Sequence, residues 1–260
     1  MSCDRWVRVE REASGLRVLT IDKPPVNALG RELVEDLSEA LEQLGRDEGA
    51  RCLIVRSAGK HFCAGADLKE RKDMSVEDVR KFVPKLAGVC RALAATPYPT
   101  IAAVAGAAAG GGCELALACD LRVLADNASI GLRETALAIV PGAGGTQRLP
   151  RLIGPSRAKR WILAAELHSA DEALRDGVAD RVVAAEALDT AARKLAETIA
   201  ANGPVAVRLA KRAIEEGAHL SLEEALEVEW EAYQETLVTE DRTEALRAFA
   251  EKRPPRFRGR

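Results

Sequence analysis

The chain has 260 residues, of which 47% are hydrophobic and 3% aromatic, so it can bury one large core built mainly from aliphatic side chains. Lys and Arg number 38 and Asp and Glu number 40, and the net charge of −2 excludes a general attraction to nucleic acid or anionic lipid. No segment reads as an apolar membrane span, and the first residues contain no apolar signal core. We therefore expect no membrane partner and a location in the cytoplasm, or in the mitochondrial matrix if a transit peptide has been removed.

The first 185 residues alternate short predicted strands with predicted helices. The strands are apolar runs bounded by turn residues, and they cover residues 6–10, 16–22, 51–56, 100–104, 121–125, 129–131 and 178–183. The helices show apolar residues at helical spacing, and they cover residues 31–44, 76–95, 113–119, 146–153 and 171–176. From residue 156 onward helical patterns dominate. The alternation predicts an α/β fold.

The remainder of the chain is almost entirely helical, with predicted helices over residues 188–201, 205–216, 221–237 and 241–251 and a basic tail after them. Capping boxes that start at Ser169 and Ser221 mark two of the helix beginnings, because a glutamate follows each serine three residues later. We place a boundary near residue 185, with a core over residues 1–185 and a helical region over residues 186–260. A region this short is expected to pack on its own core or on a neighbouring subunit.

The six cysteines form no Cys-x-x-Cys pair and show no metal-type spacing with the three histidines. This pattern is typical of scattered, reduced thiols in a reducing compartment. The sequence therefore predicts neither a disulfide framework nor a metal site.

Residues 105–134 form the most unusual stretch, in which three consecutive glycines precede a helix-forming segment. Glycine is unfavourable inside a helix or strand, so residues 110–112 predict a tight turn or backbone that lies against a ligand. Glu114 falls in the first turn of the following helix, where free N–H groups and a nearby carboxylate could together serve an oxyanion. The alternative is a close helix–strand packing site, with Glu114 interacting only with the helix dipole.

The chain also contains a second glycine-rich stretch, at residues 142–147. It lacks the final glycine of the dinucleotide-binding fingerprint, and neither glycine-rich stretch ends in the Gly-Lys-Ser/Thr of a P-loop. Both nucleotide-binding motifs are therefore excluded.

Four motifs follow one another along the chain: HFCAGADL at residues 61–68, GGGCELA at 110–116, GLRE at 131–134 and PGAGGTQRL at 141–149. Together they resemble the crotonase (enoyl-CoA hydratase/isomerase) superfamily, and the resemblance covers essentially the whole chain. Residues 64–71 and 251–255 are most similar to the methylglutaconyl-CoA hydratase-like branch. The resemblance implies a spiral of ββα units, followed by a C-terminal helical region that assembles trimers or dimers of trimers.

The resemblance also implies a coenzyme A thioester as substrate, with no separate cofactor because CoA arrives as part of it. The backbone N–H groups of Ala64 and Gly111 match the oxyanion hole for the thioester carbonyl. Glu114, ionised, would activate a water molecule, and Glu134 would deliver a proton to the α-carbon. The backbone of Gly142 matches the position that also holds this water.

The resemblance places seven further residues against the substrate or its CoA arm. They are Val26, Ala28, Ala66, Asp67, Leu68, Phe249 and Lys252. Phe249 and Lys252 would reach the CoA of a neighbouring subunit. Each has a simpler alternative: Val26 and Ala28 as core residues, Asp67 as a turn or helix cap, and the last two as a packed aromatic and a solvated lysine.

Two glutamates favour reversible hydration of a short or branched 2-enoyl-CoA, with 3-methylglutaconyl-CoA as one candidate. Isomerisation or another enolate-forming reaction is the alternative, since shuttling one proton requires only one base. Arg133 stands immediately before Glu134, and Ala136 stands where the methylglutaconyl-like branch often has a lysine, so Arg133 is a candidate to replace it.

A third alternative is an RNA-binding protein on a hydratase scaffold. It is disfavoured because residues 31–44 carry five acidic residues and a single arginine, whereas RNA binding needs a basic track. Nucleic acid is therefore not an expected partner.

Overall fold

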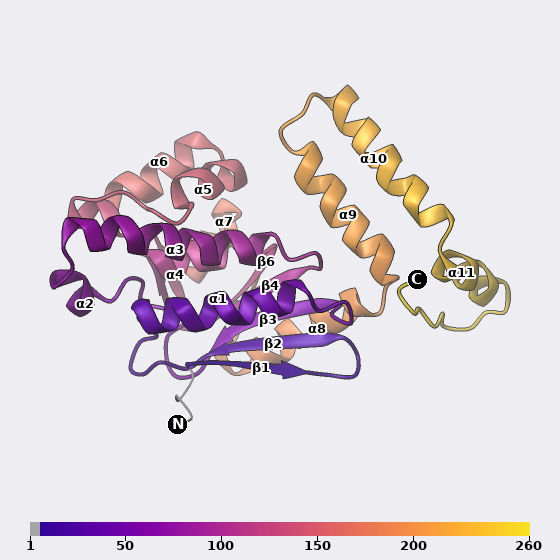
Figure 1. Ribbon diagram of the computed structural model, residues 1–260, viewed down its shortest axis with the longest axis horizontal. Coiled ribbons are helices and arrows are strands. Elements are labelled where there is room, and N and C mark those ends of the chain that lie inside the picture. Colours follow the sequence, from indigo (N-terminus) through magenta and orange to yellow (C-terminus); the bar gives the residue numbers. More distant parts are fainter. Residues whose placement is uncertain (1–5) are drawn as a thin grey trace.

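Two sheets form the centre of the computed structural model, which describes residues 6–260 (Figure 1). The large sheet contains β1 (Val7–Arg11), β2 (Leu16–Ile21), β3 (Cys52–Ser57), β4 (Thr100–Val104), β6 (Leu121–Ala125) and β9 (Arg181–Val183) in that order. The β1–β2 pair is antiparallel, and the later neighbours are parallel. The small sheet contains β5 (Ala107–Ala109), β7 (Ser129–Gly131) and β8 (His168–Ser169), with β7 at its centre.

The chain passes from the large sheet to the small sheet and then into a helix, and it does so twice in succession. The first passage is β4, β5 and α4 (Gly111–Leu117). The second is β6, β7 and the 3₁₀ helix η1 (Glu134–Leu137), followed by α5 (Gly145–Ile153) and α6 (Pro155–Ala164). This order confirms the predicted α/β class and its spiral of ββα units.

Helices cover the large sheet. The longer ones are α1 (Arg31–Gly45) and α3 (Val76–Ala94), which pack against each other, while α2 (Leu68–Lys72) and α7 (Ala170–Asp176) are short (Figure 1). The predicted apolar stripe of α1 is fully buried; it consists of Leu33, Leu37, Leu41 and Leu44. The predicted capping boxes at Ser169 and Ser221 are both present, and each serine oxygen accepts a backbone N–H three residues later.

Helix α8 (Leu188–Ala200) is the first helix after the predicted boundary near residue 185. It packs against β3, β4 and β6, and it buries Leu188, Ala192 and Ala196 within the same core as those strands. Small alanine side chains allow the helix to lie close to the sheet. The core therefore continues through α8, and the helical extension begins after it.

The helical extension consists of α9 (Pro204–Gly217) and α10 (Leu222–Leu237), which pack as a pair, and α11 (Glu240–Ala250) at their foot (Figure 1). The pair projects away from the sheets, as Figure 1 shows. Leu222, Leu226, Trp230 and Tyr233 repeat at helical spacing along α10, and each exposes more than half of its surface. Within the part of the chain described, no partner covers this apolar face.

The basic tail folds back along α11. The Asp241 carboxylate accepts hydrogen bonds from the N–H groups of Arg258 and Gly259, and Glu244 accepts one from the N–H of Arg256. The tail is thus fixed to the helix by buried carboxylates. No helix between residues 6 and 260 combines the length and the apolar composition that crossing a bilayer requires.

Candidate active site

A cavity of about 730 Å³ brings four separate segments of the chain together. Its walls come from residues 64–71, 79–86, 109–114 and 133–142. These segments include parts of all four motifs on which the family resemblance depends, and Glu114 and Glu134 both line the cavity. The fold thus brings residues that lie up to 78 positions apart in the sequence to the wall of one cavity.

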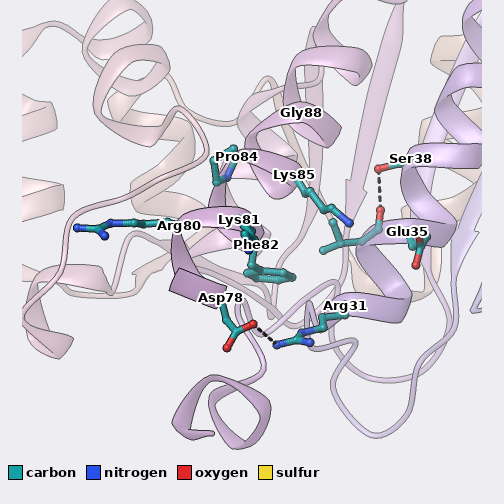
Figure 2. A pocket seen from close by; sticks show the side chains of 11 residues that line it. Arg31, Glu35, Ser38, Asp78, Arg80, Lys81, Phe82, Pro84, Lys85 and Gly88 are labelled. Atoms are coloured by element: carbon teal, nitrogen blue, oxygen red, sulfur yellow. Dashed lines mark hydrogen bonds and ion pairs between the residues drawn. The ribbon is translucent and has the colours of Figure 1, made fainter. Parts of the chain in front are cut away.

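A second hollow, of about 820 Å³, lies between α1 and α3 (Figure 2). Figure 2 shows Arg31 directed at Asp78, and their side chains form an ion pair at 3.4 Å between Nη2 and Oδ1. Lys81 of the same wall pairs with Glu77 at 3.4 Å. Such exposed, paired charges are typical of a solvated groove rather than of a reaction centre. Phe82 lines both hollows, so the groove borders the glutamate-lined cavity.

Glu114 is buried, with 2% of its surface exposed, in the first turn of α4 as predicted. Its Oε1 accepts hydrogen bonds from the N–H of Ala143 at 2.7 Å and from the N–H of Gly145 at 2.8 Å. Burial raises the pKa of Glu114, and these two N–H groups together with the charge of Arg148 oppose that rise. Two donors on one carboxylate oxygen favour the ionised form of this group.

Glu134 lies in a different environment, at the start of η1. Its Oε2 is buried and has no hydrogen-bond partner among residues 6–260. Burial, and then the nearby charge of Glu114, raise the pKa of Glu134 to about 7. A carboxyl group of this kind holds a proton near neutral pH and can donate it.

The three glycines at residues 110–112 lie where the surrounding atoms leave little room for a side chain. Gly110 adopts a left-handed φ of 53°, and a Cβ on it would lie 2.9 Å from Oε1 of Glu134. A Cβ on Gly112 would lie 2.2 Å from the carbonyl oxygen of Cys63, so this glycine is the close packing site that the sequence left open as an alternative. The expectation that all three stand outside the helix is wrong, because Gly111 and Gly112 form the first turn of α4.

The predicted oxyanion hole requires one correction. The N–H of Ala64 donates to the carbonyl of Val26 at 3.0 Å, so it is not available to a substrate oxygen. The N–H of Ala66, two residues later, donates to no group among residues 6–260. Gly111 begins α4, where an N–H has no intrahelical acceptor, and the Gly65 Cα lies close to it. Ala66 therefore replaces Ala64 as the candidate partner of Gly111.

The other predicted contacts divide into those that line the cavity and those that do not. Gly142, Ala66 and Leu68 line it, while Asp67 caps α2 by accepting from the N–H groups of Lys69 and Glu70. Val26 and Ala28 stay outside the wall, in a segment that is bound to it through the hydrogen bond from Leu29 N–H to Gly65 O. Contacts of these residues with a CoA arm remain predictions.

Phe249 and Lys252 belong to the far end of the chain and do not line the cavity. Phe249 is 85% exposed, so it is not the packed aromatic of the simpler alternative. Lys252 is exposed and has a left-handed φ of 53°. Their predicted contact with CoA bound to another subunit stays a prediction.

The cavity wall also contains residues to which the sequence argument gave no catalytic role. Arg71 lines it, with its guanidinium 5.8 Å from the centre of the Phe82 ring. Arg133 and Ala136, the two departures from the family pattern, line it as well. Arg71 lies inside the segment most similar to the methylglutaconyl-like branch, and this similarity is the feature of the sequence that could have indicated its place in the cavity.

The cysteines beside the cavity are packing residues, as predicted. Five free cysteines lie within the described part of the chain, and all are buried; Cys3 lies outside it. Burial raises the pKa of the Cys63 thiol to about 12 and that of Cys113 well above its ordinary value. Thiols held neutral in this way are poor nucleophiles.

Comparison with known proteins identifies the family to which the chain belongs. The sequence model of the enoyl-CoA hydratase/isomerase family matches residues 11–260, so the chain belongs to that family. It is 47% identical over 257 residues to human mitochondrial methylglutaconyl-CoA hydratase, covering 96% of this chain and 76% of that protein. It is 45% identical over 252 residues to human enoyl-CoA hydratase domain-containing protein 2, covering 95% of this chain and 86% of that protein.

Among solved structures, the enoyl-CoA hydratase from Bacillus anthracis superposes with a TM-score of 0.96 at 45% identity, covering 98% of this chain and all of that one. The predicted family and its crotonase-like fold are therefore confirmed.

Proposed function

We propose that the protein catalyses the reversible addition of water to the double bond of a 2-enoyl-CoA thioester. The observation that carries this proposal is the pair of buried glutamates in one cavity. Glu114 accepts two backbone N–H bonds, which favours its carboxylate form, and Glu134 has an unpaired oxygen and a pKa raised to about 7 by burial and by Glu114. One group is thus suited to accept a proton while the other is suited to give one.

The proposed reaction begins with the thioester carbonyl accepting hydrogen bonds from the N–H groups of Gly111 and Ala66. These bonds draw electron density toward the oxygen and make the β-carbon electrophilic. Glu114 and the backbone of Gly142 hold a water molecule. As its oxygen bonds to the β-carbon, its proton passes to Glu114, and the proton of Glu134 passes to the α-carbon. The reverse sequence removes water, and no separate cofactor is needed.

The acyl group that we propose carries a carboxylate at its far end, as in 3-methylglutaconyl-CoA. Arg133 lines the cavity directly beside Glu134, its side chain is exposed, and it forms no ion pair with any residue between 6 and 260. Arg71 lines the same cavity. A guanidinium binds a carboxylate through two parallel N–H bonds, so either arginine suits this group. Short or branched acyl chains without a carboxylate are the alternative.

We further propose that the protein works as a homotrimer or as a dimer of trimers. The exposed apolar face of α10, defined by Leu222, Leu226, Trp230 and Tyr233, supports this because such a face is expected to be covered by another subunit. Assembly would also bring Phe249 and Lys252 toward the CoA of a neighbouring copy.

The decisive test follows the loss of the conjugated enoyl-thioester absorbance in the presence of enzyme. The panel contains crotonyl-CoA, longer straight-chain enoyl-CoAs and 3-methylglutaconyl-CoA. We expect Glu114→Gln and Glu134→Gln each to lower kcat by about 10²- to 10⁴-fold, since each removes one proton transfer. We expect Arg133→Ala to weaken the preference for the dicarboxylic substrate while leaving crotonyl-CoA hydration near the wild-type rate.

Three outcomes would contradict parts of the proposal. Absence of hydration by correctly assembled wild-type protein would overturn the hydratase function; exchange of the α-proton without hydration would then indicate an isomerase or another enolate reaction. An unchanged substrate preference in Arg133→Ala would remove Arg133 from carboxylate recognition. Salt-dependent retardation of RNA by a protein that hydrates no substrate would favour the RNA-binding alternative.

A further inference from the structure

The segment that holds Glu114 is the glycine-rich turn at residues 141–145. Two of its N–H groups, those of Ala143 and Gly145, converge on the same carboxylate oxygen at 2.7 and 2.8 Å. Gly144 between them has a left-handed φ of 113°, which a side chain would strain. The direction of both donors therefore depends on the orientation of this turn.

Arg148, one helical turn into α5, reaches back over this turn. Its Nη1 donates to the carbonyl of Ala143 at 2.9 Å, and its Nη2 donates to the carbonyl of Cys90 in α3 at 3.4 Å. A Cβ on Gly144 would lie only 2.1 Å from Nη1, so the guanidinium occupies the space that a side chain there would need. One side chain thus links the turn to α3.

Ala143 connects the arginine to the glutamate. Its N–H donates to Glu114, and its carbonyl accepts from Arg148, so the backbone of Ala143 bonds to both side chains. Arg148 forms no ion pair with a carboxylate at contact distance in the described chain. Because no carboxylate at contact distance neutralises the charge of Arg148, this charge acts on the buried Glu114 and stabilises its ionised form.

We propose that Arg148 is a positioning residue for Glu114, which fixes the turn whose N–H groups bind the carboxylate and supplies a positive charge behind it. The inference rests on the proposed role of Glu114 as the group that activates water. It assigns no contact between Arg148 and the substrate, because the guanidinium lies on the far side of the turn and does not line the cavity that contains the glutamates.

Variants at two arginines of the same helix separate this role from a general effect on α5. Arg148→Met removes the charge and both hydrogen bonds at similar volume, and Arg148→Lys keeps the charge but cannot reach both carbonyls with a planar fork. Arg151→Met is the matched control, because Arg151 is exposed and, among residues 6–260, bonds only to Gln147 on its own helix.

For Arg148→Met we expect kcat for enoyl-CoA hydration to fall about 10- to 100-fold with KM changed little, because the base is misplaced rather than the substrate. The acid limb of the pH–kcat profile should move about one unit to higher pH, because Glu114 then protonates more readily. Arg148→Lys should keep the wild-type acid limb while losing part of kcat. Arg151→Met should match the wild type in both.

An isotope-edited infrared titration of ¹³C-glutamate-labelled protein gives a readout that does not need activity. The Glu114 carboxyl band is assigned by its absence from Glu114→Gln, and its midpoint should rise in Arg148→Met. An unchanged midpoint and acid limb in folded Arg148→Met would overturn the inference and leave a structural role only. Failure of the proposed function would look different: the wild-type protein would hydrate no substrate, or Glu114→Gln would hydrate as fast as the wild type, while the infrared midpoint would still respond to Arg148.

Discussion

Glu114 and Glu134 face one cavity, yet their surroundings give them different protonation behaviour. Backbone donors stabilise the charge of Glu114, whereas no hydrogen bond to the buried Oε2 stabilises the charged form of Glu134 within the described chain. Two carboxylates ionised together in a buried cavity would repel each other, so one proton shared between them is the favourable state near neutral pH. This asymmetry is what lets two residues of the same type act as base and acid.

A pH dependence follows from this asymmetry. The pKa of Glu134 is about 7, so below that pH the group carries the proton that it must donate, and above it the proton is lost. We expect kcat for hydration to fall as pH rises through about 7. Measuring kcat against pH with saturating substrate checks this, and a profile that stays level across neutrality would show that Glu134 is not the proton donor.

The same group should influence stability in a predictable direction. In the unfolded chain Glu134 titrates near its ordinary value of 4.5, and in the folded protein near 7, so folding takes up a proton between these values. Its contribution therefore favours the folded state below pH 4.5 and is lost as pH rises through about 7. Denaturant unfolding of Glu134→Gln should lack this component of the pH dependence.

Residue-level prediction from the sequence reached the two glutamates but not the second oxyanion-hole donor. Glu114 and Glu134 are distinctive residues within motifs, whereas Ala64 and Ala66 are identical in type and only two positions apart. The choice between their N–H groups depends on pairing with residues 26–29, where Val26 accepts from Ala64 and Leu29 accepts from Asp67. The local sequence around residues 64–67 does not predict how this segment pairs with residues 26–29.

At the scale of elements, the first turn of α4 contains Gly112, and substituting this residue shows why a glycine is needed there. Gly112→Ala should destabilise the protein by at least about 1–3 kcal/mol, because its Cβ would meet the Cys63 carbonyl at 2.2 Å and that backbone must shift. Gly88→Ala is the matched control, since Gly88 lies inside α3 with nothing within 4 Å of the added carbon. It should stabilise the fold by about 0.5–1 kcal/mol.

Urea unfolding of both variants measures these changes. Equal effects of the two substitutions would show that helix propensity, rather than close approach to Cys63, determines the glycine at position 112.

Long periodic elements were predicted well, whereas two of the shortest strands, β5 and β8, were missed. The apolar stripe of α1 and the continuous strands β3 and β4 have enough residues to reveal their period. Strands β5 and β8 contain three and two residues, and β5 consists only of alanines, so neither carries a strand pattern. They form because β7 offers a partner, which is a tertiary cause.

For the whole molecule, the apolar face of α10 should decide the state of assembly. A charge at its centre, as in Trp230→Glu, is expected to convert the proposed trimers largely to monomers, because an unpaired charge in an apolar interface is strongly unfavourable. Sedimentation velocity measures the change. Glu227→Lys, on the same helix but outside the apolar set, should remain assembled.

If Trp230→Glu sediments like the wild type, the apolar face of α10 does not hold the subunits together. Loss of assembly in both variants would instead point to a general effect of charge on this helix.

The wall of the cavity comes from separate parts of the chain. The candidate thioester-binding N–H groups belong to residues 66 and 111, held by the β2–α1 segment and by α4, whereas residues 133–140 and the side chains of α3 form another part of the wall. Substitutions such as those at Arg133 and Ala136 can therefore alter the wall without displacing the thioester-binding groups. Proteins descended from one ancestor can in this way keep the same thioester-binding groups while their specificity for the acyl group changes.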